Sequence, residues 1–385
     1  MTAVLMGVLA LVVLGTLALH LGSAALTAWR YLRPAPPTGG YPGRPFVSLV
    51  RPVCGLDRYD AETLESSFAL DYPEYEILFC AARESDPAVA LVRDLIARHP
   101  EARAQLLIGE ERISSNPKLN NLAKGWAAAR ADWIVLADSN LLLPADYLDQ
   151  LFAVWRPDTG LVTSPPAGIR GQGLWGAVEC AFLNSFQARW QLAADQVGLG
   201  FAQGKTLMWP RDVLDRAGGL AALGHDLAED VASTKVVRAQ GLRVRLARRA
   251  FAQPIGPRRL ADVWGRQLRW ARVRRDGFVG LFVLEILLGP VPPVLAMLAL
   301  GWGAWVPPLL MLWYGAEIAL ARLAGWPCGP RDCAAMVLRD LALPVLWLAT
   351  WARRGFDWRG TAMLPVAEAE AAHPLRPGTS VGAAE

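Results

Sequence analysis

The sequence has few charged residues for its length. Of its 385 residues, 19% are charged and 53% are hydrophobic, whereas soluble proteins average about 25% charged residues. The formal net charge of +4 is small and mostly reflects basic residues next to apolar segments, so the composition does not indicate a nucleic-acid partner. Sixteen tryptophans favour a membrane protein, because tryptophan gathers at membrane–water interfaces.

The sequence also lacks the motifs of several common kinds of site. No Gly-x-Gly-x-x-Gly motif or P-loop follows a predicted strand, which argues against those two nucleotide-binding folds. No Ser/His/Asp or Cys/His set suggests nucleophilic catalysis. The cysteines form no Cys-x-x-Cys pair, so neither a zinc site nor a disulfide framework is indicated, and a reducing compartment fits; they are Cys54, Cys80, Cys180, Cys328 and Cys333.

A long apolar run stands at the N-terminal end. Residues 3–28 hold no acidic or basic side chain other than a histidine, and about 20 apolar residues span a bilayer. We predict a membrane anchor over residues 1–30, because the apolar core of a cleaved signal peptide is shorter. Arg30 and Arg33 place the end of this anchor on the cytoplasmic side. The Pro- and Gly-rich residues 31–45 predict a linker.

The chain is apolar again over residues 277–355. Residues 277–300 and 305–321 predict a hairpin of two membrane helices, each with one acid, Glu285 and Glu317. Such acids either mark a substrate or ion path or pair with arginines.

A third apolar stretch, residues 334–352, is interrupted by Arg339 and Asp340. A third full crossing would carry the basic residues that follow to the outer side, against the positive-inside rule. We therefore expect this segment to be re-entrant or to lie in the membrane interface. Residues 356–385 predict a tail that is partly disordered.

Residues 46–276 have the pattern of an α/β domain. Short apolar runs alternate with helical patterns, which predicts a parallel sheet with right-handed crossovers. The last of these runs is apolar throughout, which suits a strand buried on both faces. The predicted strands are 46–53, 75–82, 104–109 and 133–138, and the predicted helices between them are 62–70, 87–99 and 120–131.

Acidic residues stand where these elements end or begin. Asp138 closes a predicted strand, and ligands of open α/β sheets lie beyond the carboxyl ends of strands. Asp86 precedes Pro87, and Glu229 and Asp230 stand at another expected helix start. Each acid alone is explained by a helix cap or a turn.

Together the acids fit a transferase that uses a sugar nucleotide. An aspartate and phosphate oxygens can hold a divalent cation, which offsets the charge of the diphosphate. A separate carboxylate would remove the proton from the attacking hydroxyl. Cationic side chains would stabilise the departing diphosphate. The segment 266–270 supplies two arginines and a tryptophan, unless it forms a snorkelling belt at the membrane interface.

The order of these motifs resembles a known family. Asp86, Asp138-Ser-Asn, Ala-Glu-Asp230 and Arg-Gln-Leu-Arg-Trp (266–270) are similar to the D, D, D, (Q/R)xxRW pattern of lipid-linked glycosyltransferases. With Asn-Pro-Lys-Leu-Asn-Asn (116–121), the chain most resembles the ceramide glucosyltransferase family, family 21. The resemblance implies a GT-A fold and an inverting transfer, dependent on Mg²⁺ or Mn²⁺, from UDP-glucose to ceramide. It also implies that the catalytic domain lies on the cytoplasmic side of a bacterial inner membrane.

The resemblance assigns roles to individual residues. Asp138 would hold the metal and the diphosphate, and Asp230 would be the general base. Three further residues would bind the nucleotide, and another three would line the acceptor and diphosphate site; these are Asp86, Asn116 and Lys118, and Arg266, Arg269 and Trp270, respectively.

Two features depart from the family pattern. Asn140 stands where a second acid is usual, which leaves the metal fewer carboxylates. Residues 200–209 resemble instead a bacterial branch associated with hopanoids, proposed to transfer N-acetylglucosamine to a polyhydroxylated triterpenoid, a bacteriohopanepolyol. Lys205 in this stretch either binds the diphosphate or is a solvated surface lysine. A non-catalytic membrane scaffold is a further alternative.

Overall fold

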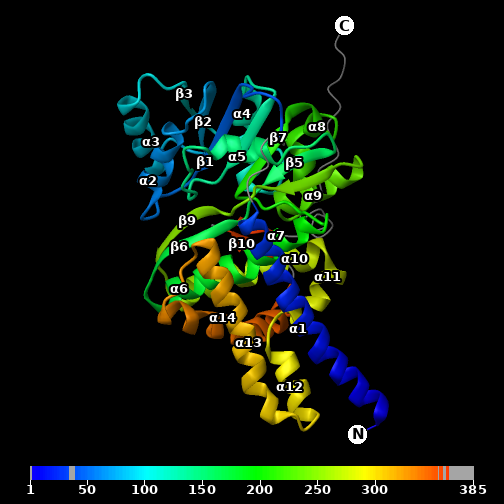
Figure 1. Cartoon of the computed structure of the whole chain (residues 1–385). Coiled ribbons are helices and arrows are strands. Elements are labelled where there is room, and N and C mark those ends of the chain that lie inside the picture. The colour runs from blue at the N-terminus through cyan, green and yellow to red at the C-terminus, as the bar shows by residue number, and fades with distance from the viewer. Residues whose placement is uncertain (1, 34–39, 354, 359–360, 364–385) are drawn as a thin grey trace.

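The computed structural model describes residues 2–33, 40–353, 355–358 and 361–363. Figure 1 shows a sheet with its covering helices at one end of the molecule, apolar helices at the other, and a middle layer of helices between them. The apolar end contains α1 (Ala3–Leu32), α11 (Val279–Leu284), η4 (Glu285–Leu288), α12 (Val291–Ala299), η5 (Gly303–Trp305), α13 (Val306–Ala324) and α14 (Pro330–Thr350); the middle layer contains α6 (Gly173–Ala181), the π-helix η2 (Phe182–Ala188), α7 (Arg189–Gln196) and α10 (Leu260–Gly277).

Seven strands form one mixed sheet in the order β3-β2-β1-β4-β7-β5-β8. The strands β4, β5 and β7 are buried along their whole length, as the apolar runs require. Two small sheets pair β6 with β9 in parallel and β10 with β11 antiparallel. The strands are β1 (Val47–Val53), β2 (Tyr75–Ala81), β3 (Ala104–Ile108), β4 (Trp133–Ala137), β5 (Thr159–Thr163), β6 (Pro166–Gln172), β7 (Thr206–Pro210), β8 (Arg243–Leu246), β9 (Phe251–Pro257), β10 (Phe356–Trp358) and β11 (Thr361–Met363).

The helices that pack on the sheet begin where the sequence provides caps. Asp86 and Asn116 each accept a backbone N–H at the start of a helix whose first residue is proline, the usual arrangement at an N-terminus. On the second of these helices, Gly125 allows close packing, because a Cβ there would lie 2.5 Å from Val50. These helices and turns are α2 (Asp60–Glu65), η1 (Ser66–Phe68), α3 (Pro87–Arg98), α4 (Pro117–Ala128), α5 (Tyr147–Ala153), α8 (Arg211–Asp215), η3 (Gly219–His225) and α9 (Glu229–Ala239).

The sheet is only partly parallel, which corrects the prediction. Strands β3, β2, β1 and β4 run parallel as expected, but β7 pairs antiparallel with β4 and with β5. The chain enters β7 from the carboxyl end of β4, so β7 has to run in the opposite direction. Its first residue, Thr206, pairs with Ala137, and this register sets Lys205 directly beside Asp138.

Three helices of the described part are long and apolar enough to cross a membrane, namely Ala3–Leu32, Gly303–Ala324 and Pro330–Thr350. The segment predicted as a membrane helix over residues 277–300 is not one straight helix. This stretch forms two helices bent by 63°, because the backbone is extended at Gly289 and restarts as a helix after Pro290. The bent pair counts as a fourth span only if its two halves cross together.

A closed group of charges joins α13 and α14 to the middle layer. Glu317 lies 3.2 Å from Arg189 and 2.9 Å from Arg339, whose guanidinium also pairs with Asp340 at 2.7 Å. All four side chains are at most 2% exposed. We call Arg189, Glu317, Arg339 and Asp340 the anchor cluster; it explains how α14 carries Arg339 and Asp340 within an unbroken helix.

The predicted segment boundaries shift slightly at the two ends of the chain. Helix α1 extends to Leu32, two residues into the predicted linker, of which residues 34–39 lie outside the described residues. Strands β10 and β11 pair within the predicted tail. The rest of that tail, residues 364–385, lies outside the described residues.

Candidate active site

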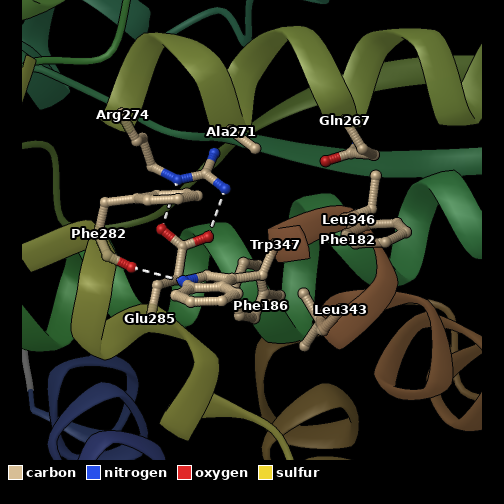
Figure 2. Close-up of a pocket in the computed structure, with 10 residues that line it drawn as sticks. All are labelled: Phe182, Phe186, Gln267, Ala271, Arg274, Phe282, Glu285, Leu343, Leu346 and Trp347. Carbon is tan, nitrogen blue, oxygen red and sulfur yellow. Dashed lines mark hydrogen bonds and ion pairs between the residues drawn. The ribbon is translucent and has the colours of Figure 1, made fainter. Parts of the chain in front are cut away.

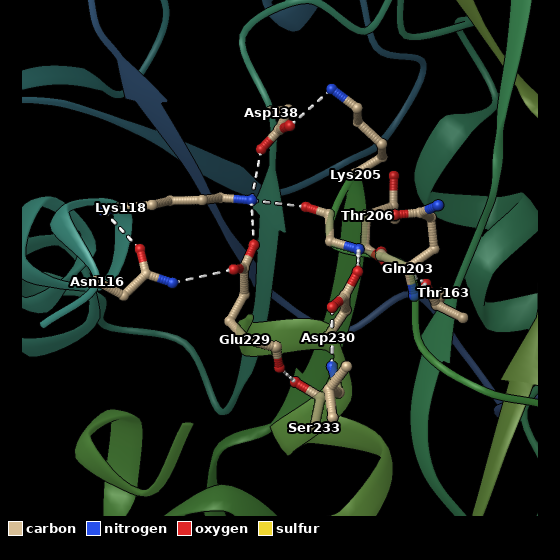
Figure 3. A network of polar contacts seen from close by, with 12 residues as sticks. Asn116, Lys118, Asp138, Thr163, Gln203, Lys205, Thr206, Glu229, Asp230 and Ser233 are labelled. Atoms are coloured by element: carbon tan, nitrogen blue, oxygen red, sulfur yellow. Dashed lines mark hydrogen bonds and ion pairs between the residues drawn. The ribbon is translucent and has the colours of Figure 1, made fainter. Parts of the chain in front are cut away.

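Asp138 lies directly after β4, at the carboxyl edge of the parallel strands. Its backbone N–H donates to the carbonyl of Lys205 at 3.1 Å. Its carboxylate pairs with Lys118 at 2.6 Å through Oδ1 and with Lys205 at 2.9 Å through Oδ2 (Figure 3). Burial would raise the pKa of Asp138, but the two ammonium groups outweigh burial and hold that pKa well below its usual range. Asp138 is therefore an ionised carboxylate placed for a cation.

Arg51 fixes the backbone that follows Asp138. Its fully buried guanidinium donates to the carbonyls of Asp138, Ser139 and Leu141 at 2.7, 3.1 and 2.9 Å. Burial lowers the pKa of Arg51 to about 10, so the side chain stays charged at neutral pH. No sequence motif indicates this role, because Arg51 stands inside an apolar strand.

The Asn-Pro-Lys-Leu-Asn-Asn segment delivers Lys118 to this point. Asn116 caps α4 by accepting the N–H of Lys118 at 2.9 Å. Asn120 accepts two N–H groups of the preceding loop. Asn121 donates to the carbonyls of Val53 and Cys80, at 3.4 and 2.8 Å, which ties α4 to the sheet. The motif thus explains the position of Lys118 through local hydrogen bonds.

Glu229 and Asp230 begin α9 on the other side of Lys118. Glu229 lies 2.6 Å from Lys118 and accepts from Asn116 at 3.2 Å. Asp230 accepts the N–H of Gly204 at 3.3 Å, and the carbonyl of Gly204 accepts from Lys118 at 2.8 Å. A side chain at residue 204 would displace the Glu229 carboxylate, because a Cβ there would lie 2.6 Å from it.

Asp230 differs from Asp138 in its charge environment. Burial, together with the negative charge of Glu229, raises the pKa of Asp230 to about 6. A carboxylate with a pKa near the working pH is suited to act as a general base. We call the five charged residues of this network the site cluster; they are Lys118, Asp138, Lys205, Glu229 and Asp230 (Figure 3).

The structure brings together part of the predicted site. Asn116, Lys118, Asp138 and Asp230 meet in one network, as expected. Glu229, which also belongs to this network, had no predicted role of its own. The interpretation of Lys205 as a solvated surface lysine was wrong, because its side chain is 11% exposed and pairs with Asp138.

Other predicted site residues lie beside this network. The carboxylate of Asp86 accepts the N–H groups of Gly55 and Ala88, so its helix-cap role is confirmed and its nucleotide role stays a prediction. On α10, Arg266 pairs with the buried Glu179 at 2.9 Å. Trp270 packs against a small apolar cluster of Cys180, Leu183 and Ile255.

Arg266 nevertheless acts on the site cluster through its charge. The pKa of Lys205 is lowered, mainly by burial. The ion pair with Asp138 opposes this shift, and the positive charges of Arg266 and Lys118 add to it. The predicted roles of Arg266, Arg269 and Trp270 at the acceptor and diphosphate site stay predictions.

The oxygen donors beside β4 fit a divalent cation that shares its ligands with a substrate. Asp138 offers a carboxylate and Asn140 an amide oxygen, and the ammonium of Lys205 lies within 3.0 Å of both, so a cation is already favoured between them. No group of three or more His, Cys, Asp or Glu side chains that could hold a metal occurs among the described residues. Mg²⁺ commonly uses one or two carboxylates together with substrate phosphates.

Apart from the site cluster, a small hollow lies between the middle layer and the apolar helices (Figure 2). Arg274 and Glu285 form a two-bonded ion pair at 2.8 and 2.6 Å on one side of it. The remaining lining is mostly apolar and aromatic: Phe182, Phe186, Gln267, Ala271, Phe282, Leu343, Leu346 and Trp347. The end of α10 lies close to α9, because a Cβ at Gly277 would lie 2.7 Å from Val231, the residue after Asp230.

The sheet and the position of its strand-end acid define the class of protein. The structure resembles a solved mannosyltransferase of Pyrobaculum calidifontis, determined with GDP-mannose and Mn²⁺, with a TM-score of 0.51 and 18% identity. The match covers 89% of this chain and 97% of that one. This likeness shows a GT-A-like glycosyltransferase fold, as predicted.

The chain belongs to glycosyl transferase family 21, whose family model matches residues 5–370. Ceramide glucosyltransferase 1 of Caenorhabditis elegans is 30% identical over 64% of this chain, which spans 53% of that relative. Ceramide glucosyltransferase 3 of the same organism is 26% identical over 82% of this chain and 72% of the relative. The predicted family is therefore confirmed, and the chain spans about half the length of the first of these relatives.

Proposed function

We propose that this protein is a membrane-bound, inverting glycosyltransferase that moves a sugar from a UDP-sugar to a lipid hydroxyl, with UDP-glucose and ceramide as donor and acceptor. The observation that carries the proposal is the site cluster. It places an ionised carboxylate with two lysines next to a second carboxylate whose pKa is raised to about 6. One half of this arrangement suits a diphosphate and its cation, and the other suits proton removal.

The reaction needs one displacement. The acceptor hydroxyl oxygen forms a bond to the anomeric carbon of the sugar while the bond from that carbon to the phosphate oxygen breaks. Asp230 takes the hydroxyl proton, and UDP leaves with the electron pair of the broken bond. Attack opposite the leaving group inverts the anomeric centre, so a second nucleophilic carboxylate is not required.

The residues around Asp138 bind and stabilise the diphosphate. Asp138 and Asn140 would hold a divalent cation, which supplies positive charge against the diphosphate when it is bound. Lys118 and Lys205 contribute two further positive charges beside it, and the charge of Arg266 reaches Lys205. Preorganised charges of this kind stabilise the departing group without reorganisation cost.

The hollow of Figure 2 has room for about one water molecule, so it supports a lipid acceptor only through the apolar character of its lining. Its aromatic and aliphatic lining comes mainly from η2, α11 and α14, with Ala271 from α10, and α10 ends against the residue after Asp230. A lipid acceptor would lie with its apolar part against this lining and the apolar helices, and its hydroxyl group would have to reach Asp230. We further propose that residues 1–30 and 277–355 hold the catalytic domain, residues 46–276, on the cytoplasmic side of a bacterial inner membrane.

A product assay tests the proposal. Purified protein in detergent is given Mg²⁺ or Mn²⁺, UDP-glucose or UDP-N-acetylglucosamine, and ceramide or a polyhydroxylated hopanoid, and lipid products are identified by mass spectrometry. We expect glucosylceramide, absent with Asp230→Asn. An N-acetylhexosaminyl hopanoid would replace the proposed donor and acceptor and keep the mechanism. No product and no UDP release above the Asp230→Asn level would contradict the proposal and favour a scaffold.

A further inference from the structure

Two of the four lysines of the chain converge on one carboxylate. Only four of its 39 lysine and arginine residues are lysines. Lys118 and Lys205 each place an ammonium group on one oxygen of Asp138, at 2.6 and 2.9 Å (Figure 3). Lys205 also donates to the amide oxygen of Asn140 at 3.0 Å. Its ammonium therefore lies between the two oxygens that a divalent cation would use.

The two lysines are held differently. Lys118 has further partners in the Glu229 carboxylate and the Gly204 carbonyl, at 2.6 and 2.8 Å. If another cation took Asp138, Lys118 would keep both of these partners. The Lys205 ammonium would lose its ion pair with Asp138 and its bond to Asn140. Lys205 is thus the lysine that a second cation at this point displaces.

We propose that Lys205 is an internal counter-cation that competes with the divalent ion for Asp138 and Asn140, and that it moves to the donor diphosphate when nucleotide and metal bind together. This inference rests on the proposed function, since it takes the ligand to be a nucleotide diphosphate. Two cations cannot share the same two oxygens, because they repel strongly at short distance in a site of low polarity. The diphosphate gives the ammonium a new anionic partner, and the flexible lysine stem allows the movement.

The exchange couples the two ligands of the site. A divalent ion that binds alone has to displace Lys205 and leave its charge uncompensated. A divalent ion that binds with a nucleotide displaces Lys205 onto the phosphates. By linkage, the nucleotide raises the affinity for the metal by the same factor as the metal raises the affinity for the nucleotide. Lys205 would contribute to this factor in addition to the direct contact between metal and phosphate.

The test measures binding rather than activity. Binding of Mn²⁺ to the full-length protein in detergent is titrated by calorimetry or electron paramagnetic resonance, without nucleotide and with UDP. Lys205→Met keeps the length of the side chain and removes its charge. We expect this variant to bind Mn²⁺ alone about tenfold more tightly than the wild type, and UDP in saturating Mn²⁺ about tenfold more weakly. Lys235→Met is the matched control, because Lys235 pairs with Asp226 and is 46% exposed; both affinities should stay unchanged.

The outcomes separate this inference from the proposed function. If Lys205→Met binds Mn²⁺ without nucleotide no more tightly than the wild type, the proposed competition is overturned, even if the wild type transfers sugar. If the wild type transfers no sugar but Lys205→Met still binds Mn²⁺ more tightly, the result would support the competition and contradict the proposed function. Thermal unfolding shows whether the variant is folded. Should it not fold, Lys205→Gln, whose shorter side chain keeps a hydrogen-bond donor and removes the charge, should show the same tightening.

Discussion

The molecule contains two groups of buried charges that differ in the cations they use. The site cluster pairs two of its carboxylates, Asp138 and Glu229, with lysines. The side chains of Asp138, Lys118 and Lys205 are 23, 14 and 11% exposed. The anchor cluster pairs its carboxylates with arginines, and its side chains are at most 2% exposed. One group stands at the carboxyl edge of the sheet, and the other joins the apolar helices to the middle layer.

The choice of cation matches what each group has to do. A lysine ammonium is a point charge on a flexible stem and can change partners, whereas a guanidinium is a planar fork that several acceptors can fix. Arg339 donates to Glu317, Asp340 and Ser185 and to the carbonyl of Ala181. With the proposed exchange of Lys205, buried ion pairs in one chain would serve two purposes, exchange with ligands and permanent attachment.

Replacing Asp230 with asparagine tests the exchangeable group and should have the largest effect. Loss of a general base lowers turnover by about 10²–10⁴-fold. The same change should stabilise the fold, because burial and Glu229 raise the pKa of Asp230 from 3.8 to about 6. The ionised carboxylate then costs stability, and this cost appears as the pH rises from about 4 to 6.

The measurements for this variant are product formation and thermal unfolding at several pH values. At pH 7 the asparagine variant should unfold at a higher temperature than the wild type, and below pH 4 the difference should vanish. Asp226→Asn, which removes the partner of Lys235, should leave turnover near that of the wild type. Retained turnover in Asp230→Asn would remove Asp230 from the mechanism.

Glu317→Gln tests the fixed group, and its effect should be on stability. The change leaves the buried guanidiniums of Arg189 and Arg339 without their shared carboxylate, and breaking a buried pair in this way costs about 3–5 kcal/mol. Unfolding in detergent should therefore occur at a much lower temperature, with the UDP affinity of the folded fraction unchanged. A variant as stable as the wild type, but with altered activity, would instead support a substrate or ion path through Glu317.

Sequence patterns predicted the parts of the fold that depend on local signals. The first four strands and the helices between them were predicted because each is a periodic run with its own caps, as Asp86 and Asn116 show. Strand β7 was missed because five residues ending in proline carry little periodic signal. The break at Gly289 and Pro290 was visible in the sequence, but the surrounding apolar run outweighed it in the prediction.

The residues of the site also separate into those that local sequence signals predicted and those that depend on distant parts of the chain. Asp138 at a strand end and Lys118 in its motif were predicted, since both depend on short stretches of chain. Lys205 could not be assigned, because its partner lies across the antiparallel pairing of β4 with β7. The role of Glu229 likewise depends on Lys118, which is distant in sequence. Long-range pairing of charges is thus the part of the site that sequence reasoning could not supply.

The pH dependence of turnover should show a smaller effect of the same buried carboxylate. Because Asp230 must be ionised to accept a proton and has a pKa of about 6, kcat/KM should fall about tenfold per pH unit below pH 6. Glu229→Gln removes the negative charge that helps to raise this pKa, so the fall should begin at a lower pH. A pH profile for Glu229→Gln that matches the wild type would show that Glu229 does not set the acidity of the base.

An exposed ion pair gives the smallest expected effect and the baseline for both clusters. Arg93 and Glu84 are 2.6 Å apart, as close as Lys118 and Asp138, yet their side chains are 57 and 60% exposed. Exposed pairs contribute about 0.2–1 kcal/mol and weaken with salt, so Arg93→Gln should change the unfolding free energy by less than about 1 kcal/mol and leave turnover unchanged. If Arg93→Gln lowered the unfolding free energy as much as Glu317→Gln, burial would not explain the difference between exposed and buried ion pairs. The pairing itself would then determine how much each charge contributes to stability.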